Sequence, residues 1–280
     1  MKINAIYPAF DGEVNPQGIG EPVVVLRLQG CHIRCYKKTL GVFCDTPEAL
    51  NRSKDSDAVE DIANSVLSIC RLYKIGRVLL TGGDPLWNDE GEIKTLLKLL
   101  SASFIKVNVE TSGTLKIDPY FSPQTRQYVK FVLDYKLPSA GIKAPNILDE
   151  MSDVSEFLEA MRHTHAIKFV CKDLEEVDLA IATVARWVER IYNSDDGVEV
   201  LYRHHALFGL PKIAIGLYYG SDVKLIDLMS YLLEKKRQLA MELMHRWFVE
   251  YVCINAQLHN LAQIPGEVLL DNLDPNLRKI

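Results

Sequence analysis

The chain has 280 residues, of which 48% are hydrophobic and 25% charged, a composition typical of a globular protein with a well-filled core. Its formal net charge of -5 argues against a broad surface for nucleic acid. No apolar run approaches the roughly 20 residues that a membrane helix needs, and residues 1–10 lack the basic flank and apolar stretch of a signal peptide. We therefore expect a cytoplasmic protein that binds neither nucleic acid nor membrane.

The first part of the chain alternates between apolar runs of strand length and segments with helical periodicity. Continuous apolar, β-branched runs occur at 23–28, 77–81, 106–110, 129–134 and 166–171. Apolar residues at helical spacing occupy 57–73, 92–100 and 173–192, and the last segment opens with Asp173 and a carboxylate three residues later. This alternation predicts an α/β fold with a mostly parallel sheet, either open or curled into part of a barrel.

The signals weaken after Asn193. A surface turn at 193–197 precedes a predicted strand at 212–219, a helix at 222–244, a last strand at 247–256 and a polar tail at 266–280. No internal repeat is visible. We expect one domain over residues 1–280, with an extended C-terminal region from about 193 onward.

Three of the six cysteines, Cys31, Cys35 and Cys44, lie close together directly after the first predicted strand. Disulfides are rare in the cytosol, and three thiolates on one loop suit a metal ion or an iron–sulfur cluster. A closed zinc site needs four ligands, which His32 could complete, whereas three cysteines leave one iron open for a cofactor or substrate. The residues alone leave a cluster, a zinc site and an inert loop as alternatives.

Polar segments follow the next three predicted strands. The second strand ends in 81–85 (Thr-Gly-Gly-Asp-Pro), where the glycines let the backbone approach a ligand and Asp84 offers a carboxylate to an ammonium group. The third ends in 110–114 (Glu-Thr-Ser-Gly-Thr) and the fourth in 134–139 (Asp-Tyr-Lys-Leu-Pro-Ser). Each segment by itself resembles an ordinary turn, and a lysine such as Lys136 is usually solvated. Together, at the carboxyl ends of neighbouring strands, they predict a ligand site.

These motifs together resemble the 7-carboxy-7-deazaguanine synthase family of radical S-adenosylmethionine (SAM) enzymes. The resemblance rests on the cysteine loop with its Cys-Asp-Thr at 44–46 and on the three segments above, and it extends to 10–13 and 257–259. It implies a partial (β/α) TIM-like barrel of the radical SAM type, usually a homodimer. It also implies a lyase of queuosine biosynthesis, which converts 6-carboxy-5,6,7,8-tetrahydropterin to 7-carboxy-7-deazaguanine by radical ring contraction with loss of ammonia.

The resemblance further implies the cofactors and the residues that hold them. A [4Fe-4S] cluster is expected on Cys31, Cys35 and Cys44, with SAM on its open iron, Mg²⁺ at Thr46, and a reductant of the flavodoxin or ferredoxin type. No side chain is expected to be catalytic beyond these cofactors. The expected SAM contacts are Gly82, Gly83, Asp84, Thr111, Ser112, Asp134, Lys136 and Ser139, and the expected pterin contacts are Glu13, Arg27, Glu110 and His259.

The sequence departs from the family pattern in three places. Eight residues separate Cys35 from Cys44, where radical SAM enzymes usually have two, and Asp11 and Ser112 stand where glutamine and asparagine are frequent. Two alternatives to the synthase reaction follow from the residues. One is another radical SAM enzyme, such as a glycyl-radical activase or one that acts on a different heterocycle. The other is a non-catalytic scaffold that binds zinc or an iron–sulfur cluster.

Overall fold

Among the residues that the structure describes, eight strands form a single sheet in which neighbours along the chain are also neighbours in space. The computed structural model describes residues 1–16, 18–33, 35, 44, 46–50, 56–194, 210–218 and 221–255. The first two strands are antiparallel and every later pair is parallel. The predicted mostly parallel α/β fold is therefore confirmed.

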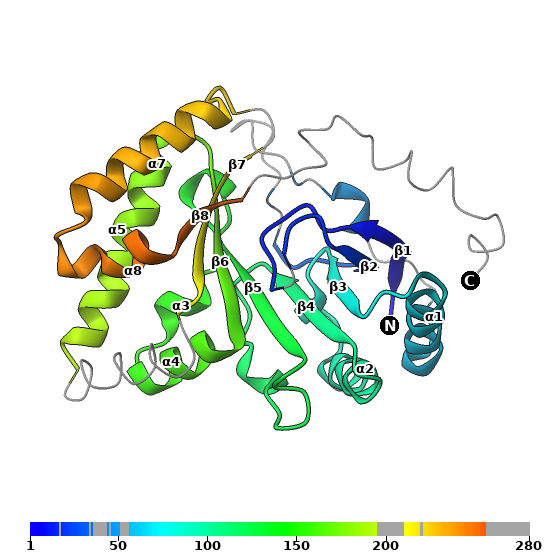
Figure 1. Ribbon diagram of the computed structural model, residues 1–280. Helices are drawn as coiled ribbons and strands as arrows, with labels where there is room; N and C mark the ends of the chain where they lie inside the picture. The colour runs from blue at the N-terminus through cyan, green and yellow to red at the C-terminus, as the bar shows by residue number, and fades with distance from the viewer. Residues whose placement is uncertain are drawn as a thin grey trace.

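The elements follow one another in a regular order (Figure 1). The strands are β1 Ile3–Phe10, β2 Pro22–Leu28, β3 Arg77–Gly82, β4 Lys106–Thr111, β5 Val129–Tyr135, β6 Thr164–Cys171, β7 Lys212–Leu217 and β8 Val252–Ile254. The helices are α1 Val59–Tyr73, α2 Glu90–Ala102, α3 Ile147–Glu150, α4 Val154–His163, α5 Leu174–Tyr192, α7 Leu225–Leu239 and α8 Arg246–Tyr251. Short 3₁₀ turns include η2 Pro47–Ala49, η3 Pro85–Trp87 and η5 Pro138–Ala140.

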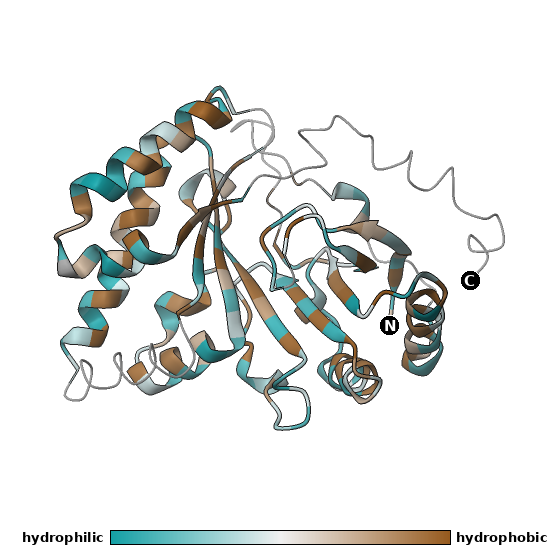
Figure 2. Ribbon diagram, viewed as in Figure 1, coloured by the Kyte–Doolittle hydropathy of each residue, from teal (hydrophilic) through white to brown (hydrophobic). Residues whose placement is uncertain are grey.

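The helices lie along the outer side of the sheet, from α1 next to β1 round to α8 next to β7 and β8, and α7 lies beside α5 and α8 (Figure 1). One contiguous core fills the space between the helices and the sheet. Because side chains alternate along a strand, Phe131, Leu133 and Tyr135 of β5 face this core while Val132 and Asp134 face the opposite, inner side. Figure 2 shows the resulting mixture of apolar and polar residues along the strands.

The sheet is a partial barrel. Within the part of the chain that the structure describes, β8 does not pair with β1. The connection between β1 and β2 instead crosses the inner side, because the Val14 amide donates a 3.0 Å hydrogen bond to Asn255 Oδ1, directly after β8. Val14 packs there against Val132, Ala166 and Ala214. The sequence pattern left an open or a curled sheet as alternatives, and the structure has the curled sheet that the family resemblance implied.

Four parts of the fold differ from the sequence-based expectation. Strand β1 and helices α3 and α4 were not predicted, and the predicted strand at 247–256 is the helix α8 followed by the three-residue strand β8. Trp247 explains the last difference, because its ring lies 6.1 Å from that of Trp187 on α5 and its indole nitrogen donates to the Pro211 carbonyl at 2.9 Å. These tertiary contacts outweigh the strand propensity of the local sequence. No helix in the described ranges combines the length and apolar character that crossing a bilayer requires.

Candidate active site

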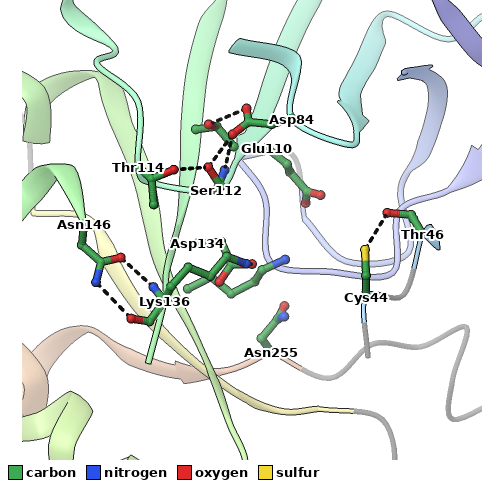
Figure 3. A network of polar contacts seen from close by, with 12 residues as sticks. Cys44, Thr46, Asp84, Glu110, Ser112, Thr114, Asp134, Lys136, Asn146 and Asn255 are labelled. Atoms are coloured by element: carbon green, nitrogen blue, oxygen red, sulfur yellow. Dashed lines mark hydrogen bonds and ion pairs between the residues drawn. The ribbon is translucent and has the colours of Figure 1, made fainter. Parts of the chain in front are cut away.

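The carboxyl ends of β2 to β5 bring the predicted segments to one edge of the sheet. Since these strands are parallel and adjacent, the polar residues that follow them lie at the same edge. Figure 3 shows Asp84, Ser112 and Lys136, from the turns after β3, β4 and β5, and Asp134, near the end of β5, on one side of a common region, with Cys44 and Thr46 on the other.

Asp84 is fully buried and joins the turn after β3 to the end of β4. Its Oδ1 accepts hydrogen bonds from the Leu86 amide (3.0 Å) and Thr111 Oγ1 (2.9 Å). Its Oδ2 accepts from the Ser112 amide (3.3 Å) and from the Ser112 hydroxyl. These four donors compensate the burial of the carboxylate. Asp84 therefore holds the turn against β4, and its contact with an ammonium group stays a prediction.

His32 extends this network toward the cysteine loop. Its Nε2 lies 2.8 Å from Thr114 Oγ1, which lies 2.7 Å from Ser112 Oγ. The ring stacks on Trp87 with a centroid distance of 5.0 Å, and Nδ1 lies 3.9 Å from Asp84 Oδ2. Burial lowers the pKa of His32, and the charge of Asp84 offsets part of this effect. Because Thr114 engages Nε2 and Nδ1 lies near Asp84, the orientation of the ring argues against His32 as a fourth zinc ligand.

Gly82 and Gly83 let the chain pack closely on itself. A Cβ at Gly82, where φ is +130°, would lie 2.1 Å from the carbonyl oxygen of Leu28, and a Cβ at Gly83 would lie 2.3 Å from that of Gly30. Backbone hydrogen bonds seal the contact, since Gly83 N donates to Leu28 O (3.2 Å) and Asp84 N donates to Gly30 O (2.9 Å). The two glycines therefore admit the segment that carries Cys31, whereas their predicted contact with SAM stays a prediction.

None of the three clustered cysteines is in a disulfide; Cys31 is buried, and Cys35 and Cys44 are half-buried. Burial raises the pKa of Cys31 to about 12, and the charge of Asp84 contributes to the rise. A thiolate at this position therefore requires a nearby cation, which a bound metal supplies. Positions 34, 36–43 and 45 lie outside the described residues. Within the described ones, no three His, Cys, Asp or Glu side chains gather closely enough to hold a metal ion, so the three-cysteine site stays a prediction.

Thr46 lies between the cysteine loop and the glycine turn. Its hydroxyl donates to the Gly82 carbonyl at 3.2 Å and lies 3.7 Å from Cys44 Sγ. The structure thus brings Thr46 next to two predicted site residues, and its contact with Mg²⁺ stays a prediction.

The side chain of Lys136 is only 14% exposed, and its Nζ pairs with Asp134 Oδ2 at 2.5 Å. Asn146 fixes the backbone here by accepting from Lys136 N at 2.7 Å and donating to Lys136 O at 3.0 Å. Burial alone would lower the pKa of Lys136, but the charges of Asp134 and Cys35 outweigh it and raise the pKa. Lys136 is therefore not the solvated surface lysine that is usual in a turn. It carries a positive charge near Cys35.

Glu176 anchors Ser139. Its carboxylate accepts hydrogen bonds from the Ser139 amide (2.8 Å) and hydroxyl (2.7 Å) and from the Lys172 amide (2.7 Å). The predicted N-cap of α5 is confirmed, since Asp173 Oδ1 accepts from the Glu176 amide at 3.0 Å. The Glu176 carboxylate thus holds the segment after β5. The contact of Ser139 with SAM stays a prediction.

A buried ammonium group lies among carboxylates on the inner side of the sheet. Lys168 Nζ is 2.7 Å from Glu13 Oε2, and the two side chains are only 9% and 12% exposed. Asn255 Nδ2 donates to the same oxygen at 3.2 Å. Burial opposes the charge of Lys168, but Glu13, Glu110 and Asp134 outweigh it and raise the pKa of Lys168.

The other predicted pterin contacts have partners of their own. The Thr81 hydroxyl donates to Glu110 Oε2 at 3.3 Å. Arg27 Nη1 donates to Glu48 Oε1 at 2.8 Å. His259 lies outside the described residues. The structure therefore places Glu13 and Glu110 around one lysine and Arg27 beside Glu48, while the binding of a pterin by these residues stays a prediction.

Curated proteins similar to this chain share one name, 7-carboxy-7-deazaguanine synthase. The one from Methanospirillum hungatei is 26% identical over 252 residues, which are 89% of this chain and 85% of that protein. The one from Methanopyrus kandleri is 30% identical over 193 residues, or 62% of this chain and 71% of that protein. The chain belongs to the 7-carboxy-7-deazaguanine synthase family. It is therefore an enzyme of this kind.

Other comparisons add less to this assignment to the synthase family. No protein-family model matches the chain. The solved structure of SuiB from Streptococcus suis has a TM-score of 0.46 and 12% identity, over 89% of this chain and 52% of that one. The chain thus spans about half the length of SuiB, and so distant a likeness carries no information on chemistry.

Three residues of this synthase-family site were not predicted from the sequence. Lys168 had a usable signal, because it alternates with the core residues Ile167 and Phe169 in a buried strand and so had to face inward. Glu176 was assigned to the helix cap alone. Asn255 had no local signal, since only the return of β8 to the β1–β2 connection gives it a partner.

Proposed function

We propose that the chain is a radical SAM enzyme that converts 6-carboxy-5,6,7,8-tetrahydropterin to 7-carboxy-7-deazaguanine with loss of ammonia, in the biosynthesis of queuosine or related 7-deazapurines. Membership of the synthase family supports this reaction. The structural observation that carries the proposal is the common sheet edge at which the cysteine loop meets Asp84, Thr111, Ser112, Asp134 and Lys136.

The donor set fits a [4Fe-4S] cluster with three protein ligands. Cys31, Cys35 and Cys44 form no disulfide, and thiolates are the ligands that such clusters prefer. The engagement of His32 by Thr114 and Trp87 argues against His32 as a fourth ligand, which suits an open iron. When bound, the cluster supplies the electron for reductive cleavage of SAM.

SAM and Mg²⁺ would bind beside the cluster. The backbone at Gly82 and Gly83 and the polar groups of the strand ends would orient SAM, with Lys136 supplying a fixed positive charge. The Thr46 hydroxyl and the adjacent Gly82 carbonyl are oxygen ligands of the type that Mg²⁺ prefers.

Glu13, Arg27, Glu110 and His259 would bind the pterin. Carboxylates such as Glu13 and Glu110 accept the N–H groups of a pterin ring, and a guanidinium such as Arg27 pairs with a carboxylate through two parallel hydrogen bonds. Arg27 would exchange Glu48 for the substrate carboxylate. These contacts would hold one ring hydrogen near the reacting centre and exclude water. A homodimer, a flavodoxin or ferredoxin donor and a cytoplasmic location complete the proposal.

Anaerobic reconstitution tests the proposal. The chain, loaded with iron and sulfide, is incubated with dithionite, SAM and 6-carboxytetrahydropterin, and we expect 7-carboxy-7-deazaguanine by mass spectrometry. Formation of 5′-deoxyadenosine without the deazaguanine would reject this substrate and favour a different radical SAM reaction. Zinc without iron or sulfide in anaerobically purified protein would favour the scaffold alternative.

A further inference from the structure

We propose that Lys168 is a positioning residue that, together with Asn255, holds the Glu13 carboxylate where the pterin binds. This inference rests on the proposed function, because Glu13 contacts a substrate only if the pterin binds on the inner side of the sheet. Neither residue belongs to the motifs of the sequence analysis, and both contact Glu13 in the structure.

Two donors from distant parts of the chain meet at one carboxylate oxygen. Lys168 Nζ of β6 and Asn255 Nδ2, directly after β8, lie 2.7 Å and 3.2 Å from Glu13 Oε2. Glu13 itself belongs to the connection between β1 and β2. A carboxylate that receives an ammonium and an amide donor from two other elements has a defined orientation.

Asn255 is itself held rigidly. Its side chain accepts from the Val14 amide at 3.0 Å, and its backbone amide donates to the Ile215 carbonyl at 2.8 Å. Residue 216 is a glycine, and a Cβ there would lie 2.8 Å from the Asn255 carbonyl oxygen. Asn255 is 3% exposed, and its side chain contacts Glu13 and Val14, two consecutive residues of the β1–β2 connection. Its position is therefore fixed.

The ammonium group of Lys168 compensates the charge of the largely buried Glu13 carboxylate. Glu13, Glu110 and Asp134 all act on Lys168, and Asp134 also pairs with Lys136. Removal of the Lys168 ammonium would leave these three carboxylates with Lys136 as their remaining ammonium partner among these residues. A buried carboxylate without its cation either takes up a proton or moves toward water, and in both cases Glu13 would no longer present the same acceptor to a ring N–H.

Lys130 provides a matched control on the neighbouring strand. It is also a partly buried lysine of the same sheet, but its Nζ donates to the Arg162 carbonyl at 2.6 Å. Lys130→Met removes a lysine, a hydrogen bond and a charge without changing the partners of Glu13. It therefore reports the general cost of such a change.

The test measures pterin turnover and pterin-independent SAM cleavage in the reconstituted full chain. In Lys168→Met we expect KM for carboxytetrahydropterin to rise about tenfold or more, while 5′-deoxyadenosine formation without pterin stays within about twofold of the parent. Asn255→Asp, which keeps the acceptor for Val14 but turns the donor to Glu13 into a carboxylate, is expected to raise KM similarly. Lys130→Met is expected to change neither quantity by more than about twofold. An unchanged KM in Lys168→Met, or an equal loss of both activities, overturns the proposal.

If Lys168→Met folds too poorly for the activity measurements, the melting temperatures of the cluster-free proteins still test the inference. Lys168→Met should melt below the parent, and the double variant Lys168→Met/Glu13→Gln should recover at least half of the loss, because both charges are then absent. A double variant that melts below Lys168→Met overturns the coupling. A parent protein that forms no deazaguanine would instead reject the proposed function, while the melting comparison still measures the coupling of Lys168 to Glu13.

Discussion

Asp84 and Lys168 are buried and Lys136 is largely buried, and each has partners matched to its charge. Hydroxyl and amide donors surround Asp84, whereas carboxylates face the two lysines. Groups of this kind are costly to bury and depend on every partner. Their concentration at one edge and on the inner side of one sheet is typical of a functional site.

Asp84→Ala is expected to destabilise the protein by about 3 kcal/mol, because Thr111, Ser112 and the Leu86 amide lose a buried acceptor. Urea unfolding of the cluster-free protein measures the change. Asp89→Ala is the control, since Asp89 only caps α2 by accepting from the Glu92 amide and should cost about 1 kcal/mol. Equal losses in the two variants would contradict the assigned role of Asp84.

Asp11 predicts a pH-dependent stability. Burial raises the pKa of Asp11 to about 6 from 3.8, although the Glu13 amide donates to its carboxylate. Because the folded pKa is raised, the native protein is penalised as the pH rises from about 4 through 6, and the full penalty of up to about 3 kcal/mol is present above that range.

The variant Asp11→Asn keeps an acceptor for the Glu13 amide but cannot ionise. It should therefore be more stable than the parent at pH 8, and the difference should shrink through pH 6 and vanish near pH 4. Urea unfolding at these three pH values measures it, with the exposed Asp118→Asn as control. A constant difference across the pH range would argue against a titrating Asp11.

At the scale of elements, small residues at strand ends decide how closely the segments of the site approach. Gly83 packs on Gly30, Gly113 on the Asp134 backbone, and Gly216 on Asn255. In each pair the glycine lies at the end of one strand, and its neighbour lies at the end of an adjacent strand of the sheet. The edge of the sheet is therefore compact because side chains are missing where the backbones meet.

Gly83→Ala is expected to destabilise the protein by about 1–3 kcal/mol and to reduce iron incorporation, because its Cβ would lie 2.3 Å from the Gly30 carbonyl next to Cys31. Thermal melting and iron content are the measurements. Gly76→Ala, where a Cβ meets nothing within 4 Å, should be neutral or slightly stabilising. Full iron loading in Gly83→Ala would show that the contact with Gly30 is dispensable.

Glu176→Ala is expected to release the Ser139 segment and weaken SAM binding by about fivefold or more, close to 1 kcal/mol. Equilibrium binding of SAM to the reconstituted protein measures this effect. Glu175→Ala is the matched control, because Glu175 is exposed in the same first turn of α5. If both variants bind SAM alike, the anchoring of Ser139 by Glu176 has no functional consequence.

At the scale of the whole molecule, the cysteine loop and the hydrophobic core are separate. The core runs from β1 to α8 between the sheet and the helices, and Cys70 and Cys171 belong to it. Cys31, although buried, does not. Loss of a ligand cysteine should therefore affect the cofactor far more than the fold.

Cys44→Ala is expected to keep the melting temperature of the cluster-free protein within about 2 °C while abolishing the brown cluster absorbance after reconstitution. Cys70→Ala, 4% exposed on α1, should show the reverse, with a loss of about 1 kcal/mol and normal cluster absorbance. Cluster absorbance retained in Cys44→Ala would mean that the third ligand is a different residue.

The sequence by itself determined the parallel α/β fold, the order of β2 to β7 and the segments that form the site. These features depend on local patterns, namely apolar runs, helical spacing, and glycines and polar residues at strand ends. The N-cap at Asp173 could also be predicted from the sequence, because its partner Glu176 lies three residues away.

Only the tertiary structure decided which polar groups meet. Lys168, Asn255 and the anchoring role of Glu176 depend on partners between 37 and 242 residues away in the chain. The tertiary structure also decided that most of the predicted strand at 247–256 is the helix α8, with only β8 as a strand, because Trp247 packs on Trp187. Contacts of this kind depend on how the sheet curls and where its ends return, which no local pattern encodes.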